Sequence, residues 1–169
     1  LQIAETIEDV GGDINAYTGK EVTAYYLKVL QEDSDLGIDI LSDIIKNSVL
    51  PEEEIERERG VIISEIGQSY DTPDDRVFEN FTSTAFIEQS IGRPILGTKE
   101  TVGNFNKVDL QTFMNSHYGL ENMVVSASGN INSDWFFDTV NEKFSNIKHK
   151  VKSSNLDIKW NSGFYGEDR

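Results

Sequence analysis

The chain has 169 residues and carries 30 Asp and Glu against 15 Lys and Arg, which gives a net charge of -15 at pH 7. Hydrophobic residues make up 37% of it, which is typical of one globular domain with a core and not of a disordered chain. The acidic balance argues against nucleic acid or an anionic membrane as main partner, and the absence of cysteine excludes a disulfide framework and a thiolate metal site.

The first part of the chain predicts a helix, a hairpin and a second helix. Apolar spacing predicts a helix over residues 1–10, and Gly11 with Gly12 ends it as a C-cap. Alternation over residues 13–18 and the β-rich stretch 22–30, separated by a turn at Gly19, predict a β-hairpin. Asp33 or Ser34 then caps a helix with an apolar face.

Helix signals dominate the middle of the chain. Pro51 begins a third helix that runs to about Ser69, and Pro73 marks a break before the helical pattern resumes. Thr98 caps a short helix further on, and Asn106, with an acidic residue three positions later, forms a capping box for the next one.

The last part predicts a buried strand over residues 123–127, a helix capped by Ser133, and a polar linker over residues 150–155. No apolar run approaches the ~20 residues that a membrane helix needs. Helices and strands are mixed without regular β-α-β alternation. The pattern therefore predicts an α+β fold, with helices packed on one face of a mainly antiparallel sheet.

Two carboxylates stand out in the helix that begins at Pro51. Glu58 and Glu65 lie seven residues apart, so they share one side of the helix at the border of its apolar sector. We expect both to point inward, which is costly unless each is paired, hydrogen-bonded or bound to a metal. Arg59 lies near the same sector, and on spacing alone a buried ion pair is the simpler explanation.

The histidines do not form a metal motif. Only His117 and His149 are present, and they form no His-x-x-x-His pair. We expect His117 to play a structural role at a helix C-terminus and His149 to be exposed in a lysine-rich stretch. A single glutamate does not make a zinc site, which usually has three protein ligands. The sequence also shows no glycine-rich phosphate loop and no Ser-His-Asp arrangement.

Four ordered segments nevertheless resemble one known family. They are residues 7–18 (Ile-Glu-Asp-Val-Gly-Gly-Asp-Ile-Asn-Ala-Tyr-Thr), 56–65 (Glu-Arg-Glu-Arg-Gly-Val-Ile-Ile-Ser-Glu), 92–98 (Gly-Arg-Pro-Ile-Leu-Gly-Thr), and His117-Tyr118 followed by Asn122-Met123. Together they resemble the pitrilysin and insulin-degrading family of zinc peptidases, and most of all its branch of processing peptidase β-subunits and their bacterial relatives.

The resemblance implies a zinc site and a peptide-binding strand. The family carries an inverted His-x-x-Glu-His motif and a distal glutamate as third zinc ligand. Glu65 matches that ligand, and Glu58 matches the carboxylate that supports the site. Asn15 and Ala16 match an edge strand that binds an extended peptide through main-chain hydrogen bonds; a simple hairpin strand is the alternative.

The resemblance also implies an acidic subsite. In processing-peptidase β-subunits, two acidic residues receive an arginine near the cleavage site, and they correspond here to Asp75 and Glu79. These are four residues apart, on one face of a helix. Asp74 takes the place of Asp75 if the register shifts by one residue, and solvated helix charge is the alternative.

The His-x-x-Glu-His motif is absent from the sequence. In the family it precedes the stretch that resembles residues 1–10. The resemblance thus implies that residues 1–169 are an N-terminal peptidase domain that lacks its leading strand, its zinc-motif helix and its C-terminal end. We expect no catalytic residue in the chain, since the general base would lie upstream, and no activity of the chain alone.

For the complete protein, the resemblance implies a zinc metalloendopeptidase, a hydrolase that cleaves extended, arginine-containing peptides. Zn²⁺ is its cofactor, and its expected partners are a basic peptide and a second homologous domain or subunit, with neither nucleic acid nor membrane insertion. The abundance of Ile, Asn and Lys points to an AT-rich genome and so favours a bacterium. The expected location is the bacterial cytoplasm, and a mitochondrial matrix is the alternative.

Two other functions remain open. One is a non-catalytic structural subunit of the same fold, like the core proteins of a respiratory complex. The other is an unrelated α+β binding module in which Glu58 and Glu65 are only ion-paired.

Overall fold

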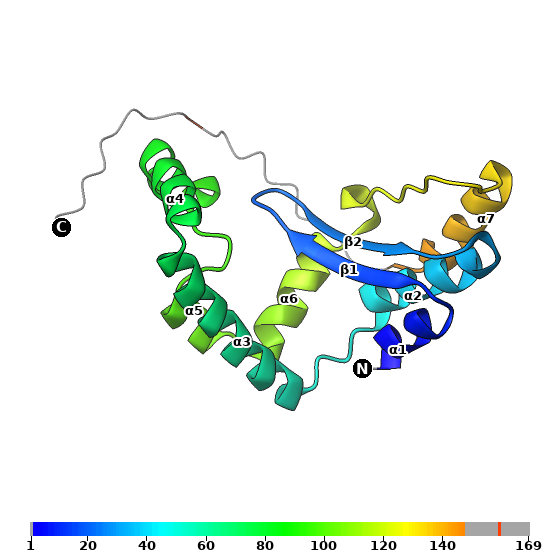
Figure 1. Ribbon diagram of the computed structural model, residues 1–169, viewed down its shortest axis with the longest axis horizontal. Helices are drawn as coiled ribbons and strands as arrows, with labels where there is room; N and C mark the ends of the chain where they lie inside the picture. The colour runs from blue at the N-terminus through cyan, green and yellow to red at the C-terminus, as the bar shows by residue number, and fades with distance from the viewer. Residues whose placement is uncertain (1, 148–158, 160–169) are drawn as a thin grey trace. The chain divides into compact units, whose positions relative to one another are not determined.

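The computed structural model describes residues 2–147 and residue 159 (Figure 1). The chain divides into two compact units. Unit 1 comprises Leu1–Thr18, Thr23–Val49 and Gln111–Lys152, and unit 2 comprises Gly19–Val22, Leu50–Leu110 and Ser153–Arg169. None of the helices in the described part is long and apolar enough to cross a membrane.

Unit 1 begins with a helix and a hairpin, as predicted. Helix α1 (Gln2–Asp9) ends where the Gly11 N–H donates to the Glu8 carbonyl and the Gly12 N–H to the Ile7 carbonyl, both at 2.8 Å. This is a Schellman motif, and it requires the positive φ of 71° that Gly11 adopts. Strands β1 (Asp13–Thr18) and β2 (Thr23–Lys28) follow and pair antiparallel.

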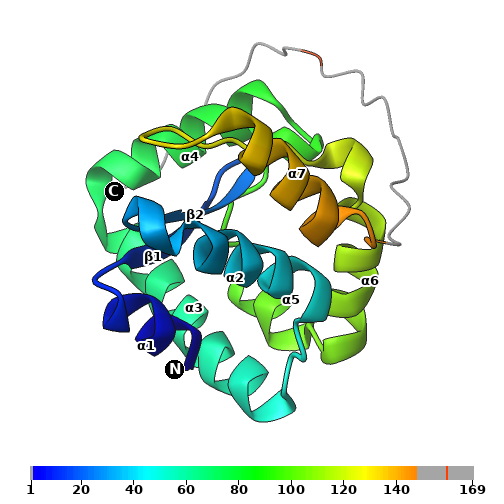
Figure 2. The same cartoon turned by 90° about the vertical axis from the view of Figure 1, so that its right-hand side faces the viewer.

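The helices of unit 1 pack on one face of this hairpin. Helix α2 (Ser34–Asn47) follows a 3-10 turn (Gln31–Asp33) and approaches β2 so closely that a Cβ on Gly37 would lie 2.8 Å from Leu27 Cδ1. Figure 2 shows α7 (Ser133–Phe144) running beside α2. Their shared core consists of the buried residues Ile38, Phe144 and Ile147.

The opposite face of the hairpin is open. Tyr17 is 57% exposed and Tyr26 is 47% exposed, and their rings lie 6.3 Å apart. The structure is thus rich in helices with a two-stranded antiparallel sheet, and the predicted α+β class is confirmed.

The described part of unit 2 is built from helices. Helix α3 (Glu52–Asp71) has Pro51 at its N-cap position, and α4 (Pro73–Ala85) begins with its proline in the first turn. The residue before that proline, Thr72, is extended and separates the two helices as expected. The buried residues are Ile66 of α3, Ala85 of α4, Gly92 in the 3-10 turn Ser90–Gly92, and Val102 of α5 (Lys99–Asn104).

Two further helices begin at the predicted capping residues, and the cap at Thr98 is a capping box, like the one predicted at Asn106. At the start of α5, the Thr101 N–H donates to Thr98 Oγ1 at 3.1 Å and the Thr98 N–H donates to Thr101 Oγ1 at 2.9 Å. At α6 (Lys107–His117), the Asp109 N–H donates to Asn106 Oδ1 at 3.1 Å and the Asn106 N–H to Asp109 Oδ2 at 3.0 Å. A 3-10 turn (Leu120–Asn122) follows α6.

The structure corrects three local predictions. Residues 123–127 form no strand, since no described segment pairs with them, and Val124 is 93% exposed. The N-cap of α7 is Asn132, whose Oδ1 accepts from the Trp135 N–H at 2.9 Å, so Ser133 is the first helical residue. Asp33 takes the N-cap position of α2, as one of the two predicted candidates, but its side chain makes no capping hydrogen bond. The predicted linker at 150–155 and His149 lie outside the described residues.

Candidate functional site

Three glutamates of α3, Glu53, Glu54 and Glu56, lie next to arginines. Arg57 bonds to Glu54 at 2.7 Å and lies 3.6 Å from Glu53, while Arg59 bonds to Glu56 at 2.9 Å. The Arg57 pairs lie on an exposed helix surface, where such contacts add little stability, whereas the side chain of Arg59 is only 16% exposed.

Glu58 and Glu65 behave differently. Both are exposed, and neither side-chain carboxylate has a hydrogen bond or ion pair within the part of the chain that the structure describes. Between them lies Val61, which is 45% exposed. The prediction that both carboxylates point inward is therefore wrong for these residues, because α3 buries the sector around Ile66 and leaves the side that carries the two glutamates open.

Arg59 is engaged elsewhere. Its guanidinium donates to the Phe105 carbonyl at 2.6 Å and to the Val102 carbonyl, in addition to Glu56. The hydrogen bond between the Arg59 guanidinium and the Glu56 carboxylate raises the pKa of Arg59 and lowers that of Glu56. Arg59 thus binds carbonyls at the C-terminal end of α5 and does not form the predicted ion pair with Glu58 or Glu65. The only signal for this role in the sequence was the position of Arg59 beside the apolar sector.

The acidic pair of α4 lies on one helix face. Asp75 is exposed and Glu79 is half-buried, and they are separated by one helical turn. Asp74, the alternative in the shifted register, is also exposed. Phe78 next to Glu79 is 71% exposed, so this surface combines carboxylates with an apolar ring.

Asn15 and Ala16 lie in β1, opposite Tyr26 and Tyr25 of β2. Both are exposed, and within the described residues β1 has β2 as its only neighbouring strand. The Ala16 N–H donates to Asn15 Oδ1 at 2.8 Å. On the partner strand, the Tyr25 hydroxyl lies 3.0 Å from the Tyr118 hydroxyl, and burial together with this hydrogen bond raises the pKa of Tyr25.

The six predicted site residues belong to different units. Asn15 and Ala16 are in unit 1, whereas Glu58, Glu65, Asp75 and Glu79 are in unit 2. Within unit 2, the structure places the first two on α3 and the other two on the helix that follows.

Among the described residues, the predicted zinc ligand Glu65 does not form part of a complete metal site. No group of three or more His, Cys, Asp or Glu side chains that could hold a metal occurs among them. The carboxylate of Glu65 is of a type that zinc accepts and is free to bind. His117 is engaged at the C-terminal end of α6, where its Nδ1 lies 3.0 Å from the Phe113 carbonyl, which agrees with the predicted structural role.

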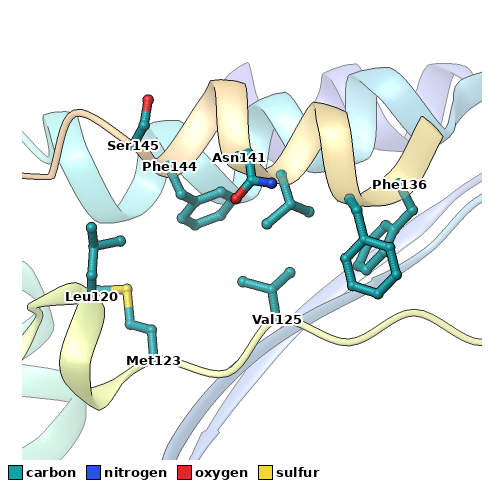
Figure 3. Close-up of a pocket in the computed structure, with 9 residues that line it drawn as sticks. Leu120, Met123, Val125, Phe136, Asn141, Phe144 and Ser145 are labelled. Carbon is teal, nitrogen blue, oxygen red and sulfur yellow. The ribbon is translucent and has the colours of Figure 1, made fainter. Parts of the chain in front are cut away.

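An apolar groove of ≈ 270 Å³ lies in unit 1 (Figure 3). Met123 and Val125 point from their extended segment toward Phe144 and Phe136 of α7. Asn141 and Ser145 are the polar residues of its lining, which contains no titratable side chain. The groove has no group for acid–base or metal chemistry.

Comparison with known proteins gives matches along most of the chain. Residues 1–99 match the family described as insulinase (peptidase family M16), and residues 104–165 match the peptidase M16 inactive domain. An uncharacterized zinc protease of Rickettsia felis is 42% identical over 162 residues, which are 96% of this chain and 39% of that protein.

The mitochondrial-processing peptidase subunit beta of Dictyostelium discoideum is 38% identical over 154 residues, which are 91% of this chain and 33% of that protein. Among solved structures, a protease from Helicobacter pylori matches with a TM-score of 0.84 and 22% identity, over 94% of this chain and 39% of that one. The last match shows the fold alone.

Proposed function

The chain belongs to the insulinase family of peptidases, family M16, and we propose that it forms part of a zinc-dependent endopeptidase that acts on extended peptides. The four motif segments had predicted this family. The chain spans about 39% of the length of the Rickettsia felis relative, so the activity proposed is that of the complete protein. In it, residues 1–169 would belong to an N-terminal peptidase domain.

The observation that carries the proposal is the state of the glutamates on α3. Glu53, Glu54 and Glu56 lie next to arginines, whereas Glu58 and Glu65 are free on an open side of the same helix. We assign Glu65 as one zinc ligand and Glu58 as the carboxylate that orients the site. When bound, zinc polarises a carbonyl and lowers the pKa of a bound water.

The test is Glu65→Gln in the complete protein. We expect the variant to lose most of its zinc and its peptide hydrolysis, because an amide is a much weaker zinc ligand than a carboxylate. Glu58→Gln should lower zinc affinity by about 10-fold to 100-fold, as losses of supporting groups do. Glu53→Gln, on the polar side of the same helix, is the matched control and should change neither quantity.

Metal analysis and turnover of an unlabelled peptide measure these effects. Full zinc content and full turnover in Glu65→Gln would refute the assignment. A protein that binds no zinc even without substitution would instead be the non-catalytic structural subunit.

We further propose that the substrate is basic and that Asp75 and Glu79 receive its arginine. Both carboxylates are on one face of α4, at a spacing that allows a guanidinium to contact both. Peptides that differ only by arginine or glutamine near the scissile bond should be cleaved with a preference on the order of tenfold for arginine, given partial screening by water.

The double variant Asp75→Ala/Glu79→Ala should abolish this preference. Asp74→Ala is the matched control for register and should retain it. An unchanged preference in the double variant would exclude the acidic subsite.

The proposed peptide site is the edge of β1 at Asn15 and Ala16, which is exposed and has no second neighbouring strand among the described residues. An extended peptide could add there as a strand. The remaining parts of the proposal are a second homologous domain or subunit as partner, which the match to the peptidase M16 inactive domain supports, and a bacterial cytoplasm as location, for which the Rickettsia felis relative supports the bacterial source alone.

A further inference from the structure

The hairpin register defines which backbone groups of β1 face its free edge. The Gly19 N–H donates to the Val22 carbonyl at 2.7 Å, so these two residues form a hydrogen-bonded pair at the turn. Such pairs alternate along an antiparallel ladder. Tyr17 therefore bonds to its partner Ala24 in β2, whereas Ala16 is in a non-hydrogen-bonded pair and its N–H and C=O point away from β2.

By the same alternation, three residues direct their backbone N–H and C=O groups toward the free edge of β1: Ile14, Ala16 and Thr18. The N–H groups of Ile14 and Thr18 have no partner within the described part of the chain. The N–H of Ala16, between them, is occupied by Asn15 Oδ1 at 2.8 Å. One outward donor of three is thus covered by a side chain of its own strand.

Covering the Ala16 N–H reduces the tendency of the β1 edge to pair with other chains. An edge strand with free N–H and C=O groups pairs readily with other extended chains, which favours aggregation. Asparagine side chains can bond to nearby backbone groups, and Asn15 is exposed, so its amide can rotate away. Replacing this bond by a main-chain bond from a peptide is nearly neutral in free energy, since one hydrogen bond replaces another.

We propose that Asn15 is a displaceable cap that covers the Ala16 N–H in the free protein and releases it when an extended peptide pairs with β1. This inference rests on the proposed function for the identity of the partner. It adds a selection step: the peptide must offer carbonyls and amides at every second residue, opposite Ile14, Ala16 and Thr18. A single exposed carbonyl does not displace the cap, whereas a strand that forms several bonds at once does.

The cap itself is tested without any peptide, by amide hydrogen exchange of the ¹⁵N-labelled 169-residue chain. We expect the Ala16 amide to exchange at least about tenfold more slowly than those of Ile14 and Thr18, because only the first is hydrogen-bonded. Asn15→Ala should remove this difference, and Asn15→Asp, which retains an acceptor oxygen, should restore it. The Tyr17 amide, bonded to β2, is the internal control and should remain slow in all variants.

An Ala16 amide that exchanges as fast as that of Ile14 in the unsubstituted chain would overturn the inference. Unchanged exchange of Ala16 in Asn15→Ala, with Tyr17 still protected, would also overturn it.

Displacement is tested by titrating the complete protein with a nine-residue arginine-containing peptide and with the same peptide N-methylated at every second residue. The unmodified peptide should shift the Asn15 side-chain resonances. The peptide whose methyl groups replace the N–H groups that would pair with β1 should leave these resonances unchanged. Asn15→Ala should bind the unmodified peptide about twofold to tenfold more tightly, because no intramolecular bond must be broken first.

The outcomes separate this inference from the proposed function. A peptide that binds without moving the Asn15 resonances overturns the displaceable cap. A peptide that displaces Asn15 but is not cleaved supports the cap and counts against the endopeptidase.

Discussion

At the scale of single residues, the charged side chains of α3 differ in their partners although they are close in sequence. Helix periodicity separated Glu58 and Glu65 from Glu53 and Glu56, and the structure also separates them, because Glu53, Glu54 and Glu56 lie next to arginines whereas Glu58 and Glu65 do not. Periodicity could not predict their burial, which depends on what covers that side of the helix. The same limit applies to Arg59, since its two carbonyl acceptors lie more than 40 residues away along the chain.

The pair formed by Glu56 and Arg59 gives a stability that depends on pH. The hydrogen bond from Arg59 lowers the pKa of Glu56 in the folded state below its ordinary value. A carboxyl group whose pKa is lowered on folding stabilises the protein above its unfolded pKa, and this contribution is lost as the pH falls through the folded pKa. Glu56→Gln should therefore unfold at lower urea concentration than the unsubstituted chain at neutral pH, and the difference should shrink at an acidic pH below the folded-state pKa of Glu56.

Urea titrations at the two pH values measure this effect. Glu58→Gln is the matched control, because Glu58 has no partner among the described residues and its substitution should leave the midpoint nearly unchanged at both. A loss in Glu56→Gln of equal size at both pH values would show that the carboxylate charge is not what matters.

At the scale of elements, cap chemistry predicted most helix boundaries. Thr98 and Asn106 each have a hydrogen-bonding residue three positions on, and Gly11 supplies a positive φ, so sequence and geometry agree there. The start of α7 was misplaced by one residue because two good capping residues, Asn132 and Ser133, are adjacent. The side chain with the better reach to a first-turn N–H could not be read from the pattern.

This correction can be tested by stability measurements. Asn132→Ala removes the acceptor of the Trp135 N–H and should lower the free energy of unfolding by about 1 kcal/mol. Ser133→Ala, one residue further, should change it by less than about 0.5 kcal/mol, since Ser133 is exposed within the first turn. Thermal unfolding of both variants under the same conditions compares them directly, and a larger effect at Ser133 would restore the original prediction.

The misjudged segment 123–127 shows another limit at this scale. Its apolar residues predict a strand, yet a strand exists only when another segment forms its hydrogen bonds. Met123 and Val125 pack against α7, whereas Val124 between them is 93% exposed. The structure therefore shows the predicted alternation of buried and exposed side chains. What the segment lacks is a neighbouring strand among the described residues.

At the scale of the whole molecule, the mixture of helix and hairpin signals predicted the α+β class. The division of the chain into two units was not predicted. The chain crosses between them several times: two crossings lie beside Gly19 and Pro51, but another falls within α6, where no glycine or proline marks it. The predicted sites are divided in the same way, with the β1 edge in unit 1 and the carboxylates of α3 and α4 in unit 2. Such divisions arise from contacts between distant segments, which local sequence patterns do not record.

The two units also imply separate local stabilities. Ile38 belongs to the core of unit 1 and is 8% exposed, and Ile66 of unit 2 is 3% exposed. Replacing either by valine removes one buried methyl group and should cost about 0.5–1.5 kcal/mol. Because each residue packs within its own unit, Ile38→Val should speed amide exchange in α2 and α7, and Ile66→Val should do so in α3 and α4.

The two variants serve as controls for each other, since the chemical change is the same. If each accelerated exchange equally in all four helices, the chain would unfold as one cooperative body. Acceleration confined to one unit would mean that the strand edge and the carboxylates can open independently, so that a peptide pairing with β1 does not by itself order the helices that carry Glu65 and Glu79.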